Sequence, residues 1–260
     1  MEYITNEEYR SAEGISRSQL AILINKTPFH FKYAKAAEKD FDSPALIFGR
    51  AAHKIILEPD TFEKEFVVAP YVDRRTKVGR DIWDAFTEDN KGKDILTEED
   101  SDKLVDMLNA FRQNELACKL IQGGKFETSW FWTDEETGEK CKVRPDCLNN
   151  VDGVNYIIDY KTTDSCEDGH FERSVKKYNY KLQAGMYREG MFQNTFEDFQ
   201  FVFIAQEKTA PYAVRVYFCT DEFMNEGYDQ FRYAINLYHD CKTTGNWYGY
   251  DTATLVEEGE

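Results

Sequence analysis

The sequence predicts a single α/β domain in which a central mixed β-sheet is flanked by helices. Its 260 residues are 42% hydrophobic and 15% aromatic, which is enough apolar surface for one large core. Helical patterns dominate the first part of the chain, and strand patterns begin near residue 123. A three-strand meander, a crossover helix, two further strands and a closing helix follow in that order, which is typical of a mixed sheet covered by helices. Within the domain 1–260 we expect a helical part over about 1–122, a sheet core over about 123–220, and a closing helix with an acidic tail over about 221–260.

The N-terminal part should form helices. Ser16 is a suitable N-cap ahead of an apolar stripe, and Pro28 suits the first turn of the next helix. Gly49 and His53 lie one turn apart on a third helix, which should end before Pro59. Gly49 would allow a close approach, whereas a lone histidine on a partly apolar helix is most often a core residue. The helices are predicted over 14–25, 27–38, 43–59, 81–88 and 97–121, with a basic loop over 70–80.

Strand patterns fill most of the second part. Residues 139–148 and 154–161 alternate as strands, and the intervening NNVDG carries the Asn, Asp and Gly that tight reversals use. We therefore expect a β-hairpin here. The last residues, VEEGE, should be frayed. The remaining strands are predicted over 123–133, 199–208 and 212–220, and further helices over 174–193 and 221–243.

Two acids and a lysine should meet at this hairpin. The side-chain period of two places Asp159 and Lys161 on one face of their strand, while Tyr160 points the other way. Asp146 can come beside them across the hairpin. Two carboxylates repel each other unless a cation lies between them, and oxygen ligands next to one lysine suit Mg²⁺ or Mn²⁺. Such a metal would polarise a phosphoryl oxygen, while Lys161 would orient or deprotonate a water or hold the phosphate charge.

Each motif alone also has an ordinary structural interpretation. An Asp-x-Lys strand is common as a solvated ion pair, and an Asp after Pro is common in turns. The combination is more informative, because RPD is followed by IIDYK and then by a helix with Gln183 and Tyr187 one turn apart on one face.

This composite resembles the PD-(D/E)XK nuclease superfamily in its RecB-like branch, and it is most similar to phage and prophage exonucleases of the exodeoxyribonuclease VIII (RecE) type. The resemblance covers about residues 14–220 and includes the segment from Gly49 to His53. It implies a restriction-endonuclease-like core in which Lys161, Asp146 and Asp159 act in catalysis. Gln183 and Tyr187 would belong to the motif on the following helix. The implied metal ligands are His53, Asp146, Asp159 and the backbone carbonyl of Tyr160.

Glu127 lies on the strand next to this motif. In many relatives an acid near this position approaches the metal, but on spacing alone an exposed strand glutamate is the simpler interpretation. We therefore place Glu127 just outside the direct metal ligands.

The resemblance also implies an activity. It points to a Mg²⁺-dependent deoxyribonuclease, with Mn²⁺ as a substitute, that digests double-stranded DNA ends processively in the 5′ to 3′ direction for phage or prophage homologous recombination. It further implies a closed homo-oligomeric ring that threads its DNA, with a single-strand annealing protein as a further partner. The alternatives are an endonuclease or helicase-associated nuclease module of the same superfamily, or a non-catalytic DNA- or partner-binding protein on this fold.

The charge balance argues against a nucleic-acid enzyme, because 32 basic residues face 48 acidic ones and the formal net charge is −16. Much of the acidic excess lies in residues 221–260, and basic stretches remain at 74–80 and 173–181. Copies of these stretches would line the channel of a ring. The 70–80 segment suits a solvated face and a DNA contact equally well. The candidate DNA-binding residues are Arg74, Arg75, Lys77, Arg80, Lys176 and Lys177.

Cysteine spacing and hydropathy predict a soluble protein in the cytoplasm of a bacterium or of a phage-infected cell. The six cysteines form no C-x-x-C pair, which argues against a zinc ribbon or a disulfide framework, and no iron–sulfur cluster is expected. No apolar run is long enough for a membrane span, and MEYITNEEYR lacks the features of a signal peptide. We expect no membrane partner.

Overall fold

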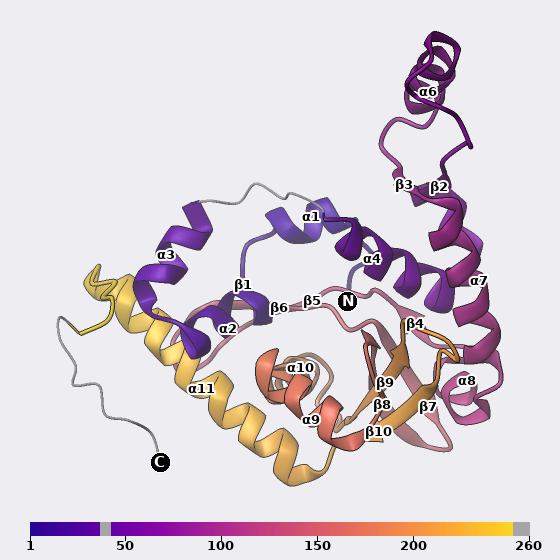
Figure 1. The fold of residues 1–260 in the computed structure, drawn as a ribbon. Helices are drawn as coiled ribbons and strands as arrows, with labels where there is room; N and C mark the ends of the chain where they lie inside the picture. Colours follow the sequence, from indigo (N-terminus) through magenta and orange to yellow (C-terminus); the bar gives the residue numbers. More distant parts are fainter. Residues whose placement is uncertain (37–42, 252–260) are drawn as a thin grey trace, which may run out of the picture.

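The computed structural model describes residues 1–36 and 43–251 (Figure 1). The end of the predicted helix 27–38 and the tail VEEGE lie outside the described residues. Among the helices within these ranges, none is long and apolar enough to cross a membrane. The helices are α1 (Asn6–Ser11), α2 (Arg17–Asn25), α3 (Pro28–Ala36), α4 (Pro44–Leu57), the 3-10 turn η1 (Pro59–Thr61), α5 (Phe62–Glu65), α6 (Lys77–Asp89), α7 (Glu98–Arg112), α8 (Glu115–Ile121), α9 (Asp168–Lys177), α10 (Tyr180–Thr195) and α11 (Asp221–Thr244).

The strands are β1 (Ile15–Ser16), β2 (Phe66–Val68), β3 (Asp94–Leu96), β4 (Lys125–Phe126), β5 (Trp130–Thr133), β6 (Lys140–Val143), β7 (Cys147–Val151), β8 (Val154–Thr163), β9 (Gln200–Glu207) and β10 (Val214–Phe218). The large sheet has the order β10–β9–β8–β7–β4, in which β8 and β9 are parallel and the other neighbours antiparallel. A small sheet has the order β1–β6–β5, and β2 pairs with β3. The predicted mixed sheet flanked by helices is therefore confirmed.

The large sheet is buried on both faces. Ile158 and Tyr160 pack with α4, α7 and α8 in one core cluster, whereas Ile157 packs with α9 and α10 in another. Successive β8 side chains thus point into opposite layers. Each fully buried isoleucine contributes about 1.5–3 kcal/mol to folding. The same alternation turns Asp159 toward the layer that contains α10.

The predicted strands 123–133 and 139–148 are each divided between two sheets. β4 lies in the large sheet and β5 in the small one, because the backbone changes direction at Glu127, which has a φ of 50°. Arg144, Pro145 and Asp146 separate β6 from β7 in the same way, and proline supplies no N–H for a ladder. The breaks are adjacent, since the Glu127 N–H donates to the Asp146 carbonyl over 3.1 Å. The prediction of a meander within one sheet was wrong.

Three helix boundaries also differ from the prediction. Residues 97–121 form two helices, because the Asn114 side chain caps α8 by accepting a 3.0 Å hydrogen bond from the Ala117 N–H. Residues 174–193 are likewise divided between α9 and α10 by Asn179, whose φ is 53°. α6 begins at Lys77 because Thr76 caps it, so the end of the predicted 70–80 loop is helical. The helix predicted over 221–243 is observed as α11.

Two glycines differ in what surrounds them. A Cβ at Gly185 would lie 2.2 Å from the carbonyl carbon of Gly227, so the crossing of α10 and α11 requires glycine. At Gly49, apart from its chain neighbours and the backbone of its own helix, no described atom lies within 4 Å of the Cβ position. The close approach predicted at Gly49 is therefore not observed among the described residues.

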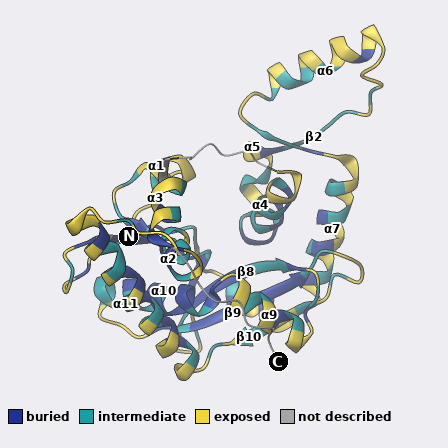
Figure 2. Ribbon diagram, turned by 60° about the vertical axis from the view of Figure 1, so that its left-hand side comes forward, coloured by how far each residue is buried: buried dark blue, intermediate teal, exposed yellow. Residues whose placement is uncertain are grey.

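One helix stands apart from the rest. α6 lies at the end of two connecting segments that rise from the paired strands β2 and β3 (Figures 1 and 2). We call residues 70–93 the arm. Most of its helix is exposed, whereas the large sheet is mostly buried (Figure 2).

Candidate active site

The β7–β8 hairpin brings Asp146 beside Asp159. A two-residue turn closes the hairpin, and both Asp152 and Gly153 have positive φ (52° and 85°), as Asp-Gly does in type I′ turns. The strand register then places Asp146 across from Asp159. Asp146 Oδ2 accepts a hydrogen bond of 2.9 Å from the Tyr160 N–H. This bond fixes the carboxylate at the open end of the hairpin, away from the turn.

Asp159 is buried beneath α10, with 1% of its side chain exposed. Lys161, two residues along β8, forms an ion pair with Asp159 Oδ1, and the Gln183 amide donates to Oδ2. The Lys161 Nζ also lies 5.1 Å from the centre of the Tyr180 ring. The Lys161 side chain is 19% exposed, so it is held by the protein and still reachable from solvent.

Arg17 joins this cluster from a distant part of the sequence. Its Nη2 donates to Gln183 Oε1 over 2.6 Å, and this bond orients the amide so that its NH₂ group faces Asp159. The sequence did not lead us to predict Arg17 as part of the site. A usable signal existed, because Arg17 is the first residue of α2, where a cation is unfavourable for the helix dipole and its presence indicates another partner.

His53, Glu127 and Asp146 form a separate group of candidate metal ligands. One side-chain atom from each lies within 4.8 Å of the others. His53 comes from α4, and the two acids come from the two breaks at which the chain passes between the sheets. His53 Nδ1 is 3.3 Å from Asp146 Oδ2. The junction of the two sheets with α4 therefore assembles this group.

Arg144 fixes Glu127 in position. Its Nε lies 3.0 Å from Glu127 Oε2 and donates to the Glu127 carbonyl over 3.1 Å. Its other N–H groups donate to the Asn6 side chain and the Ile4 carbonyl near the N-terminus. Glu127 is therefore not an exposed strand residue: it lies between strands, 30% of its side chain is exposed, and its carboxylate is among the candidate ligands. The sequence did not lead us to predict a role for Arg144 either.

The electrostatics of this group favour a cation. Burial and the charge of Asp159 raise the pKa of Asp146 well above its usual value. Burial raises the pKa of Glu127 to about 7, although Arg144 opposes the shift. Burial, reinforced by the charge of Lys161, lowers the pKa of His53 to about 4, so its imidazole is neutral at pH 7. A neutral imidazole and two carboxylates that lack enough positive charge nearby offer one nitrogen and several oxygens as ligands. This set of ligands fits a divalent metal.

Gln183 and Tyr187 share a face of α10 but have different surroundings. Gln183 contacts Asp159, whereas the Tyr187 ring lies 6.3 Å from the Phe201 ring in the core, and burial raises the pKa of Tyr187 well above its usual value. The Tyr160 side chain points to the opposite layer. The centre of the Tyr160 ring lies 5.0 Å from that of the His53 ring, edge to face, so the tyrosine packs against the imidazole and supports it.

The candidate DNA-binding cations lie in two separate places. The first set lies on the arm, which rises from β2 and β3 and stands clear of the large sheet (Figure 1). The second set is exposed at the C-terminal end of α9, next to the helix that carries Gln183. The structure therefore does not bring the first set to the candidate metal group. The arm set is Arg74, Arg75, Lys77 and Arg80, and the α9 set is Lys176 and Lys177.

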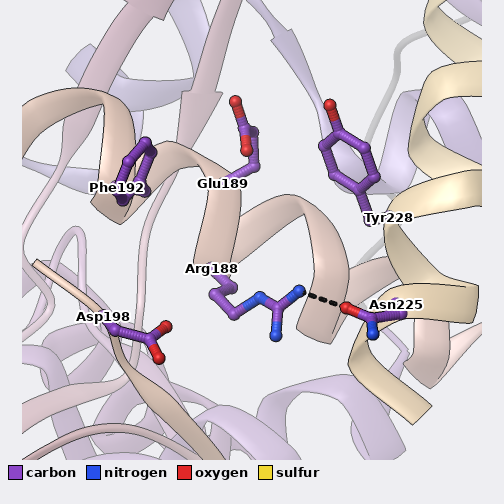
Figure 3. Close-up of a pocket in the computed structure, with 6 residues that line it drawn as sticks. All are labelled: Arg188, Glu189, Phe192, Asp198, Asn225 and Tyr228. Atoms are coloured by element: carbon purple, nitrogen blue, oxygen red, sulfur yellow. Dashed lines mark hydrogen bonds between the residues drawn. The ribbon is translucent and has the colours of Figure 1, made fainter. Parts of the chain in front are cut away.

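A pocket of about 460 Å³ lies between α10 and α11, outside this cluster (Figure 3). Arg188 points across it and donates to Asn225 Oδ1 over 2.6 Å. The acids and the lysine of the hairpin do not line it. The lining residues are Arg188, Glu189, Phe192, Asp198, Asn225 and Tyr228.

A known structure shares this fold. A protein from Eubacterium rectale, described as a candidate exonuclease, matches with a TM-score of 0.65 at 19% identity, over 94% of this chain and 88% of that one. A phage-related exonuclease from Haemophilus somnus 129PT matches with a TM-score of 0.36 at 13% identity, over 92% of this chain and 99% of that one, which is too low to carry an argument. No curated protein sequence gives a significant match. At 19% identity, the Eubacterium rectale match shows a common fold and nothing more.

The predicted PD-(D/E)XK resemblance is confirmed by a family model that matches residues 16–254. The model spans α2, the hairpin and α11, and so includes each candidate ligand described above. The chain belongs to the family described as "PDDEXK-like domain of unknown function (DUF3799)".

Proposed function

We propose that the protein is a metal-dependent deoxyribonuclease that hydrolyses DNA phosphodiester bonds. The observation that carries this proposal is the position of His53, Glu127 and Asp146 beside the buried Asp159–Lys161 pair. The acids of this group need a cation, and the Lys161 ammonium is held next to them. Two positive charges at one site are suited to a phosphodiester, because its negative charge must be stabilised as it reacts. The nuclease-like fold of the family supports the same chemistry.

His53, Glu127 and Asp146 would hold the metal. Oxygen ligands favour Mg²⁺, and Mn²⁺ should substitute because it also accepts the imidazole. When bound, a divalent ion polarises a phosphoryl oxygen and lowers the pKa of a bound water. Asp159 is the further ligand suggested by the family resemblance, but both of its oxygens have partners here. Each of these oxygens keeps a second lone pair, so Asp159 could coordinate the metal while Lys161 and Gln183 hold it.

Lys161 supplies the cationic side of the site. Asp159 and the Tyr180 ring hold its ammonium near the end of the hairpin. From there it would orient or deprotonate the attacking water, or neutralise charge on the phosphate. Gln183 holds Asp159, and Arg17 holds Gln183, so the position of Lys161 depends on both.

The finer activity that we propose is processive 5′ to 3′ digestion of double-stranded DNA ends for phage or prophage recombination. Its support is the resemblance of the motifs to exodeoxyribonuclease VIII-type enzymes. We also propose a cytoplasmic homo-oligomeric ring, because DNA repels a monomer with a net charge of −16, and enclosure retains DNA where salt screens attraction. A single-strand annealing protein is the proposed partner.

The test is digestion of end-labelled linear duplex in Mg²⁺, with Ca²⁺ and EDTA as controls. We expect the 5′ label to be released before the rest of the strand is digested, in Mg²⁺ and not in EDTA. Closed circular duplex should stay intact; its cleavage would instead support the endonuclease alternative. Binding without cleavage in Mg²⁺ and in Mn²⁺ would contradict the nuclease and favour a DNA-binding protein. Release of the DNA after each cleavage, seen on addition of excess unlabelled DNA, would contradict the ring.

A further inference from the structure

Helix α6 carries an apolar face that is open to solvent. Val78, Ile82 and Phe86 follow one another at intervals of one turn, and Trp83 lies beside them. Val78 is 67% exposed and Ile82 is 44% exposed. Trp83 is partly covered by other residues of the arm, where the Arg74 guanidinium lies 4.3 Å and the Phe86 ring centre 5.8 Å from its ring centre. The view coloured by burial shows this helix standing away from the body (Figure 2).

No other part of the described chain supplies a core for this face. The three core clusters within residues 1–36 and 43–251 contain no residue of α6. A helix of 13 residues is marginal in water when nothing packs against it. A partner that covers the apolar face would therefore stabilise the helix.

The charges of α6 indicate the kind of partner. Residues 74–80 contain cations and no acids, whereas residues 81–89 contain acids and no cations. This order opposes the helix dipole, whose N-terminal end favours acids and whose C-terminal end favours cations. A partner helix should therefore bring acids to the N-terminal end of α6 and cations to its C-terminal end. The same helix from a second copy, running antiparallel, has this arrangement.

We propose that α6 pairs with α6 of a second copy of this chain, antiparallel and around a two-fold axis at Ile82. The stripe is symmetric about that residue, so Ile82 meets its own copy while Val78 meets Phe86. A small side chain then packs against a large one at both ends. The turn that carries Arg75, just before α6, then lies near Asp89 at the C-terminal end of the other copy's helix. Each charged end is thereby neutralised by the opposite copy.

Other occupants fit these charges less well. A parallel copy would place cations against cations and acids against acids. Nucleic acid or an anionic membrane would be repelled by the acidic half of the helix, which includes Asp84 and Glu88. The pairing does not depend on the proposed nuclease activity, since no residue of α6 belongs to the candidate metal group.

The contact should be moderate in strength. One short helix offers less surface than the roughly 800 Å² per partner of a standard stable interface. Association should therefore depend on protein concentration in the micromolar range. If the chain also forms a ring, the arms would join two rings, and breaking the arm contact would halve the mass.

The first experiment is analytical ultracentrifugation of the full chain without DNA, over a concentration series. Ile82→Glu places two carboxylates on the two-fold axis and should halve the mass at the highest concentration. Thr87→Glu adds the same charge on the other side of the helix and should leave the mass unchanged. Ile82 is exposed, so the fold should survive, and circular dichroism checks this. Wild type that stays monomeric, or a mass that Ile82→Glu does not lower, would overturn the proposal.

The second experiment reads the register. Ile82→Cys should form a disulfide between two copies under mild oxidation, because residue 82 meets itself on the axis. Thr87→Cys should not, and wild type measures the background from the native cysteines. Equal cross-linking of the two variants, or none above wild type at a concentration where the chain is associated, would rule out antiparallel pairing at Ile82.

Discussion

Arg17 and Gln183 are 166 positions apart in the sequence and are joined by a hydrogen bond of 2.6 Å. Because an amide has one acceptor side and one donor side, the guanidinium on the oxygen of Gln183 directs the NH₂ group to Asp159. Asp159 in turn holds Lys161. Helix α2, which carries Arg17, thus helps to position the candidate catalytic lysine.

Loss of the Arg17 guanidinium should reduce turnover. Arg17→Met keeps the length of the side chain and removes a charge-assisted hydrogen bond of about 1.5–3 kcal/mol. We expect kcat to fall about ten- to a hundredfold, with partial recovery in Arg17→Lys. Single-turnover digestion of linear duplex measures the change. Wild-type turnover in Arg17→Met would show that Gln183 needs no external support.

Removal of Asp146, Asp159 or Lys161 should abolish cleavage. Each alanine variant loses charge at the reacting phosphate, and a loss of at least about a thousandfold is expected for groups of this kind. The control is Lys208→Ala, which breaks an exposed pair with Asp164 just beyond the ends of β9 and β8 and should leave activity intact. Circular dichroism should show a preserved fold. Retained activity in two of the three alanine variants would refute the site.

Loss of the His53 imidazole should weaken metal binding. His53→Ala removes one of three ligand atoms that lie within 4.8 Å of one another, so calorimetry should show lower Mn²⁺ affinity, and cleavage should fall sharply. His30→Ala is the control, because His30 lies on α3 and bonds to Thr27. A variant with lower thermal stability and unchanged metal affinity would make His53 a packing residue.

Ionisation of Glu127 should destabilise the metal-free protein. Its folded-state pKa of about 7 exceeds the ordinary value of 4.5, so the folded state binds the proton more tightly than the unfolded chain. The free-energy penalty of ionising Glu127 is absent below pH 4.5 and grows to its full size, about 1–3 kcal/mol, as the pH rises through the folded-state pKa of about 7. Relative to wild type, Glu127→Gln should therefore gain stability as pH rises from 5.5 to 8 in EDTA. Urea unfolding measures this gain, which Mn²⁺ should cancel; a constant difference would contradict the shift.

Substitution of the two glycines with different surroundings should have opposite effects on stability. Gly185→Ala forces a methyl group into the Gly227 backbone and should cost about 1–3 kcal/mol, which corresponds to a fall in Tm of several degrees. Gly49→Ala adds a methyl group where nothing lies within 4 Å and should stabilise α4 by about 0.5–1 kcal/mol. Thermal unfolding compares them. A neutral Gly185→Ala would mean that α10 and α11 separate easily.

The sequence by itself determined the features that depend on neighbouring residues. The Asp-Gly turn closed the hairpin, strand alternation put Asp159 and Lys161 on one face, and helical spacing defined α11. These patterns are local, because turn conformation and side-chain period act over a few residues. The family of the chain could be recognised from them.

Only the tertiary structure decided which distant residues meet. Glu127 and Asp146 lie where the chain leaves one sheet for another, and a strand pattern does not reveal which sheet a strand will join. His53 joins them because α4 packs on one face of the large sheet, and Arg17 reaches Gln183 because α2 packs beside α10. Such contacts depend on the burial of surfaces from separate elements, which no local pattern specifies. For the same reason, the open face of α6 became visible only when the rest of the core was in place.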